Sequence, residues 1–203
     1  MKTAIAIAAT STVLSAQSAA WATSGSIQDS RHGFVVEQIG DYNGNGTDDV
    51  LIGEPGDFGG SFVSRGGSVS IRDGDGSCIT IFYGGMLDRQ MGLSVSGIPD
   101  INGDGIDEIV LGSPGWQGGL GVAKYRGRVS IYFGGRSGGG LAGCAGSSYT
   151  TPDVLIDKGF STLLNGGGFG SEIEPLGDVD GDGIGDFAVG ANYGNLAQGE
   201  GAY

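Results

Sequence analysis

The sequence predicts an all-β fold made of repeated units, and three observations support this prediction. An acidic, glycine-containing loop occurs three times, at residues 41–49, 100–108 and 178–186. Short runs with the alternating, β-branched pattern of strands flank every copy. The loops begin 59 and 78 residues apart, a period that is typical of supersecondary arrays and propellers. The repeat therefore predicts the organisation of most of the chain.

Each loop is expected to join the two strands of a β-hairpin. The strands before the loops are expected at residues 35–39, 93–97 and 171–176, where the residue pattern has the period of a strand. The strands after the loops are the apolar runs DVLI, EIVL and DFAV. Each run is followed by a glycine: Gly53, Gly112 and Gly190.

Further strands are expected outside these hairpins, at residues 68–71, 79–83 and 128–133. Arg72–Gly76 is interpreted as the hairpin turn between the first two. The glycine-rich stretch 134–168 is expected to hold an outer strand and a loop. Four strands per repeat is the composition of a propeller blade, so the chain is expected to hold about three blades of a β-propeller.

The repeated loop has the chemistry of a calcium site. Oxygen-bearing side chains stand at its positions 1, 3, 5 and 9, and glycine stands at position 6, where a tight turn needs a positive φ. Calcium takes about six to eight oxygen ligands in a flexible shell, which alternate residues of a curling loop can supply. An EF-hand is excluded because position 12 holds Ile52, Leu111 and Val189 in place of a bidentate glutamate.

Glycine also recurs before each loop, in addition to the glycine that follows each apolar run. One glycine precedes each loop by eight residues, and in the third copy it follows phenylalanine, as Phe169 and Gly170. The third copy also holds Gly190 and Ala191 after the loop. With these motifs the chain resembles the FG-GAP repeats that form the seven-bladed propeller of integrin α subunits and occur in many bacterial surface proteins. The resemblance covers most of residues 31–203 and implies a partial propeller over residues 23–203. His32 and Met91 stand at the phenylalanine position of the first two copies.

The resemblance also implies the ligands of three calcium ions. Side chains at positions 1, 3, 5 and 9 and the main-chain carbonyl of position 7 would bind each ion. Glutamate stands at position 9 of the second loop, where aspartate is usual. The implied ligands are Asp41, Asn43, Asn45, Thr47 and Asp49; Asp100, Asn102, Asp104, Ile106 and Glu108; and Asp178, Asp180, Asp182, Ile184 and Asp186.

The N-terminus has the pattern of an export signal. Lys2 precedes an apolar run at residues 4–14, and Ala20–Ala22 form an A-x-A cleavage signal, so residues 1–22 are expected to be removed. An uncleaved anchor is the alternative, although the run is shorter than the about 20 residues that span a bilayer. We therefore expect a secreted or cell-surface protein with no membrane span in this sequence. The strand-like pattern at residues 199–203 predicts that the chain is a fragment of a longer protein. The resemblance to FG-GAP proteins implies that the complete ring has seven blades.

Charge and motif content disfavour two classes of function, nucleic-acid binding and catalysis. The net charge is −13, and 11 of the 23 acidic residues lie in the three loops, so nearly half of the acidic residues are concentrated at the expected metal sites. The ten Lys and Arg residues are scattered, which disfavours nucleic-acid binding. Ser137 lies in a G-x-S-x-G pattern without the strand-to-helix context of a nucleophile, and His32 is interpreted as a packing or backbone-turn residue rather than a general base. No enzymatic activity is expected.

Cys78 and Cys144 could form a disulfide in an exported protein or remain separate thiols.

The favoured function is therefore a calcium-binding adhesion or recognition module with an extracellular protein or glycan as its partner. The resemblance to integrins implies that the partner binds on the face opposite the calcium loops. Two alternatives remain open: a noncatalytic accessory domain of an exported hydrolase, and a structural protein of the cell envelope.

Overall fold

A computed structural model describes residues 3–6, 21–24, 30–56, 66–85, 87–116, 126–135, 151–157 and 167–192. Within these ranges the regular elements are strands, and each pairing between strands of a sheet is antiparallel. The strands form two four-stranded and two two-stranded sheets. The all-β prediction is confirmed.

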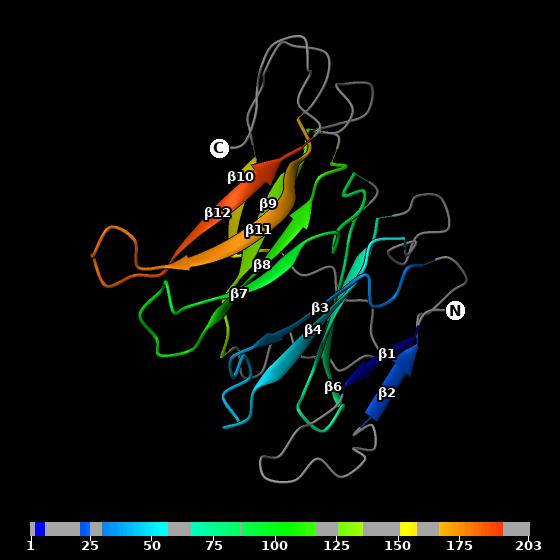
Figure 1. Cartoon of the computed structure of the whole chain (residues 1–203), viewed down its shortest axis with the longest axis horizontal. Helices are drawn as coiled ribbons and strands as arrows, with labels where there is room; N and C mark the ends of the chain where they lie inside the picture. The colour runs from blue at the N-terminus through cyan, green and yellow to red at the C-terminus, as the bar shows by residue number, and fades with distance from the viewer. Residues whose placement is uncertain are drawn as a thin grey trace, which may run out of the picture.

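Three of these sheets follow one another along the chain as blades (Figure 1). In each, the chain runs through neighbouring strands in sequence order, as in a meander. The first blade contains β3 (Val35–Ile39), β4 (Asp49–Glu54), β5 (Ser68–Arg72) and β6 (Cys78–Tyr83). The second contains β7 (Val95–Ile98), β8 (Glu108–Ser113), β9 (Arg128–Tyr132) and β10 (Val154–Asp157), and the third contains β11 (Phe169–Gly177) and β12 (Asp186–Ala191).

Most strand predictions agree with these bounds. β3 coincides with its predicted range, and β10 is the outer strand expected within residues 134–168. β7 begins at Val95, two residues later than expected, because a turn precedes it in which Leu93 N donates to the carbonyl of Gln90 at 3.1 Å. The predicted strand at residues 199–203 lies outside the described residues.

The hydrophobic core lies between the blades. Alternate residues of β8 contribute to two different clusters: Ile109 and Leu111 pack with the first blade, and Val110 packs with the third. The rings of Phe82 and Tyr132 also meet between the first two blades, with centroids 4.3 Å apart. Period-2 side-chain alternation therefore makes one strand the centre of two interfaces, which explains why residues 109–111 of β8 are apolar without interruption.

Close backbone contact between blades explains the repeated glycines. A Cβ on Gly53 would lie 2.3 Å from the carbonyl oxygen of Gly92, and one on Gly112 would lie 2.1 Å from that of Gly170. The second member of each pair also has a positive φ, 81° at Gly92 and 85° at Gly170. Glycine is required at these positions both for space and for backbone conformation.

The N-terminal segment pairs β1 (Thr3–Ala6) with β2 (Trp21–Ser24), and Trp21 Nε1 donates to the carbonyl of Gly74 at 3.1 Å. Cleavage after Ala22 stays a prediction and would fall within β2. Across the described ranges, no helix has the length and apolar character needed to cross a membrane. Cys78 on β6 is disulfide-bonded, and Cys144 lies outside the described residues.

Candidate metal centres

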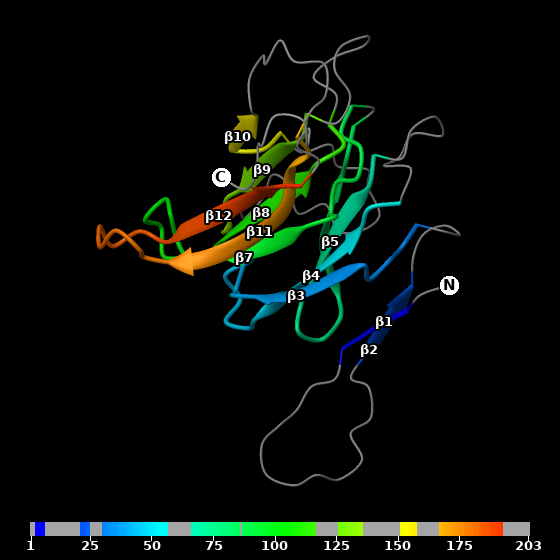
Figure 2. The ribbon, with the colours of Figure 1, turned by 45° about the horizontal axis from the view of Figure 1, so that its top comes forward.

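The three acidic loops connect β3 to β4, β7 to β8 and β11 to β12, so each lies at the tip of a β-hairpin as expected. Figures 1 and 2 both place the three tips at the same end of the blades, on the left of each view. The glycine at position 6 has a φ of 90° at Gly46, 88° at Gly105 and 90° at Gly183. This left-handed conformation turns the chain back on itself and confirms the reason predicted for glycine there.

The aspartate at position 1 organises each loop through main-chain N–H groups. The N–H of the position 6 glycine donates to this carboxylate at 2.6 Å in Asp41, 2.7 Å in Asp100 and 2.9 Å in Asp178. The N–H of position 5 donates to the other oxygen in each loop. These bonds lower the pKa of Asp100, chiefly through the N–H of Gly105. The second loop is therefore folded around a carboxylate that stays ionised.

The acidic residue at position 9 begins the following strand and accepts the N–H of position 2 in every loop. The distances are 3.0 Å to Asp49, 2.6 Å to Glu108 and 2.9 Å to Asp186. Asp49 and Glu108 are fully buried. Burial raises the pKa of Glu108, and burial followed by the charge of Asp73 raises the pKa of Asp49 to about 6. A nearby cation would remove this penalty on the ionised forms.

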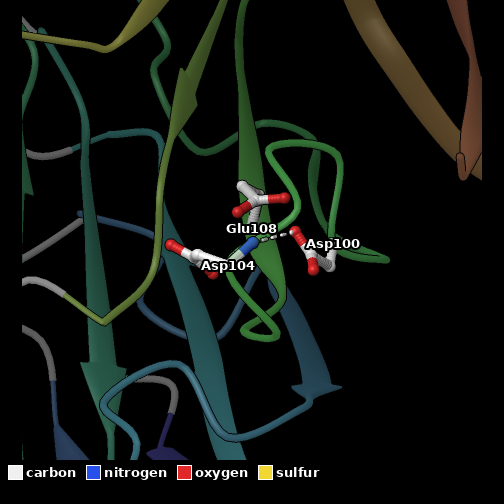
Figure 3. A group of neighbouring side chains, drawn as sticks. All are labelled: Asp100, Asp104 and Glu108. Atoms are coloured by element: carbon white, nitrogen blue, oxygen red, sulfur yellow. Dashed lines mark hydrogen bonds between the residues drawn. The ribbon is translucent and has the colours of Figure 1, made fainter.

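Carboxylate oxygens converge in the second and third loops. Figure 3 shows Asp100, Asp104 and Glu108 grouped at the end of β7 and the start of β8. One oxygen from each lies within 4.8 Å of the others, and the same holds for Asp178, Asp180 and Asp186. Asp182 is not in that group, although its Oδ1 accepts the N–H of Ile184 at 2.8 Å. These hard oxygen donors fit a calcium ion, which accepts a flexible coordination geometry.

Glutamate at position 9 of the second loop is accommodated by its length. Glu108 Oε2 accepts the N–H of Ile101, while Oε1 accepts Nδ2 of Asn102 at 2.7 Å. The side chain therefore also holds the amide at position 3, which leaves Oδ1 of Asn102 to accept the N–H of Asp104 at 2.9 Å. The replacement of aspartate by glutamate keeps the loop in the same fold.

The first loop has asparagine at positions 3 and 5, and a carboxylate from outside the loop approaches both. Asp73, in the turn between β5 and β6, accepts Nδ2 of Asn43 at 3.4 Å and also Nδ2 of Asn45. Oγ1 of Thr47 also lies 3.1 Å from Asp73, although the nearer acceptor for its proton is Oδ1 of Asn45 at 2.6 Å. The sequence-based interpretation of Arg72–Gly76 as a simple turn missed this role. The available signal was an aspartate-rich turn beside a loop that lacks carboxylates at positions 3 and 5.

The structure also places the residues at position 7 of each loop and His32. The N–H groups of Thr47, Ile106 and Ile184 donate to the side-chain oxygen at position 5 of their loops, at 2.8, 2.9 and 2.8 Å. Metal binding by their carbonyls stays a prediction. His32 is buried, with Nδ1 3.1 Å from Oε2 of Glu54, which supports the packing interpretation. Ser137 lies outside the described residues.

Comparison with known proteins identifies the repeat. A family model described as FG-GAP repeat matches residues 91–132, which run from the start of the second blade to the end of β9. The chain contains an FG-GAP repeat. This assignment agrees with the FG and GA glycines that meet between consecutive blades, and it identifies the stacked sheets as blades of a β-propeller.

The FG-GAP chain is similar to integrin α subunits along most of its length. It is 30% identical to integrin alpha-5 of Xenopus laevis over 176 residues, which are 85% of this chain and 15% of that protein. It is 33% identical to integrin alpha-V of Gallus gallus, over 84% of this chain and 15% of that protein. The match to integrin alpha-PS2 of Drosophila melanogaster is 33% identical over 84% of this chain and 11% of that protein. The chain therefore spans a small part of these curated relatives.

Proposed function

We propose that this FG-GAP chain is part of a calcium-stabilised propeller outside the cell that recognises a protein or a glycan. The observation that carries the calcium assignment is the equivalence of the three loops. Each loop folds around an aspartate at position 1 and holds an acidic residue at position 9 against the N–H of position 2. Similarity to integrin α subunits supports the recognition function, and the export signal predicted at residues 1–22 supports a secreted or cell-surface location.

Calcium would act on stability rather than on catalysis. Without a cation, the loop carboxylates face one another at short range and repel, which loosens the hairpin tips. Asp41, Asp100 and Asp178 would bind the ion from the start of each loop, while Asp49, Glu108 and Asp186 would bind it from the following strand. Extracellular modules bind calcium at about 10⁻⁴ to 10⁻³ M, and a ligand at 100 times its Kd adds about 2.7 kcal/mol per independent site. The ions would therefore fix the blade ends and preserve the shape of the opposite face.

Recognition is tested by binding of the intact protein to immobilised extracellular matrix proteins and to a glycan array, in millimolar calcium and in chelator. We expect saturable binding to a partner in calcium and weaker binding in chelator, because loosened hairpin tips disturb the blades. Heat-denatured protein is the control for nonspecific adsorption. Absence of saturable binding to every protein and glycan in calcium would contradict the recognition function.

A further inference from the structure

The first loop has fewer charged ligands than the other two. At positions 1, 3, 5 and 9 it has two carboxylates, from Asp41 and Asp49, whereas the second loop has three and the third has four. The number of charged ligands is one of the properties that set calcium affinity in such loops. A first loop acting alone would therefore be the weakest of the three sites, unless another part of the chain compensates.

Asp73 lies where such compensation is possible. It belongs to the β5–β6 turn, and two side-chain amides of the first loop donate to its carboxylate. The donors are Nδ2 of Asn43 and Nδ2 of Asn45, at alternate positions of the loop. Oγ1 of Thr47 lies 3.1 Å from Asp73, but its single proton has a nearer acceptor in Oδ1 of Asn45 at 2.6 Å. The carboxylate therefore spans the side of the loop that contains both asparagines.

These contacts determine which end of each asparagine amide faces the loop. Oδ1 of Asn43 accepts the N–H of Asn45 at 2.9 Å, and Oδ1 of Asn45 accepts the N–H of Thr47 at 2.8 Å. In the third loop, Oδ1 of Asp180 and Oδ1 of Asp182 accept the corresponding N–H groups. A rotated amide would place an N–H₂ group against a main-chain N–H and an oxygen against the Asp73 carboxylate, so both contacts would become repulsive.

The amide orientation matters because an asparagine can bind a cation only through Oδ1. In the second loop Glu108 holds the Nδ2 end of Asn102 at 2.7 Å. The shorter Asp49 lies 3.5 Å from Nδ2 of Asn43, a weaker contact, and has no recorded bond to Asn45. The geometry points to Asp73 as the positioning residue of the first calcium site: it holds Oδ1 of both asparagines on the loop side and adds the negative charge that they lack. This inference rests on the proposed calcium binding.

Calcium titration calorimetry on the intact, chelator-treated protein tests the inference, with the variant Asp73→Asn. Polar partners that orient metal ligands are typically worth about 10- to 100-fold in affinity. We expect three ions to bind the unmodified protein, and one of the three affinities to fall at least about tenfold in the variant. The matched control is Asp75→Asn, which removes an equal charge from the same turn. Asp75 accepts the N–H of Ser77 at 2.7 Å, and none of its recorded hydrogen bonds reaches the first loop.

The same Asp73→Asn substitution in a variant without the two asparagines distinguishes orientation of their amides from a general contribution of Asp73 to the site. With Asn43→Asp and Asn45→Asp, no amide needs orienting, and Asp73 faces carboxylates that it repels. In that background Asp73→Asn removes a charge but no amide depends on it, so it is expected to lower the affinity of the first site by clearly less than in the natural background. An equal fall in both backgrounds, or three unchanged affinities in the single variant, would overturn the positioning role of Asp73 while leaving calcium binding intact. Failure of the unmodified protein to bind calcium would overturn the proposed function itself.

Discussion

At the scale of single residues, acidic side chains in this protein serve two different purposes. Those in the hairpin loops converge on one another, as Asp100, Asp104 and Glu108 do. Glu37 on β3 instead lies between blades, where its Oε1 accepts Oγ of Ser96 at 2.9 Å and N–H of Gly97 at 3.3 Å. Burial raises the pKa of Glu37, and the charge of Glu174 adds to this effect. The first group is suited to bind a cation, whereas Glu37 contributes a hydrogen-bond acceptor to a blade interface.

Glu37 makes a pH-dependent contribution to stability. Because its pKa is raised in the folded state, the folded protein binds this proton more tightly than the unfolded chain, so the ionised group destabilises the fold at neutral pH. That cost disappears as the pH falls through the raised pKa towards the ordinary value of 4.5. Glu37→Gln keeps an acceptor oxygen and removes the charge. We expect it to be more stable than the unmodified protein at pH 7 and about equally stable near pH 4.

Urea unfolding between pH 4 and pH 7.5 measures this difference. Glu172→Gln on the exposed face of β11 is the matched control for the loss of one acidic side chain. A Glu37→Gln variant that is less stable than the unmodified protein throughout this range would contradict the account.

At the scale of elements, local sequence patterns predicted the hairpins because the two signals involved are local. Strand alternation and glycine at position 6 both act within one hairpin, and the structure agrees with them at β3, β4 and the first loop. The late start of β7 was not predictable from alternation, because a turn closed by Gln90 and Leu93 replaces the first predicted strand residues. The contact of Asp73 with Asn45 joins residues 28 positions apart, which no local pattern can reveal.

The glycine contact between blades gives a prediction for one such element. In Gly112→Ala, the new Cβ would lie 2.1 Å from the carbonyl oxygen of Gly170 and 2.3 Å from Oγ of Ser94. Because one of these neighbours is backbone, the blades must separate, and we expect a loss of about 1–3 kcal/mol in the free energy of unfolding. Chemical denaturation measures this loss. Gly167→Ala is the control, since the nearest atom to its Cβ would lie 3.8 Å away. Equal stability of the two variants would show that the blades tolerate a wider spacing.

At the scale of the whole molecule, blade stacking and loop chemistry are linked through the same strands. β4 and β8 each begin at a buried acidic residue of a loop and continue into the core between blades. A cation held at the strand start would therefore stabilise the interface as well as the hairpin tip. The apolar side chains of Val36 and Leu176 are exposed on the first and third blades, where further blades would stack in a ring. A ring of seven blades stays a prediction.

The central claim is that the three loops bind calcium and that this binding stabilises the propeller. The most direct test is thermal unfolding of the intact protein in millimolar calcium and in chelator, beside the variant that combines Asp178→Ala with Asp182→Ala. The account predicts a higher Tm in calcium, and a smaller calcium-dependent increase in the variant because one site is lost while two remain. The same Tm in calcium and in chelator for the unmodified protein would contradict the account.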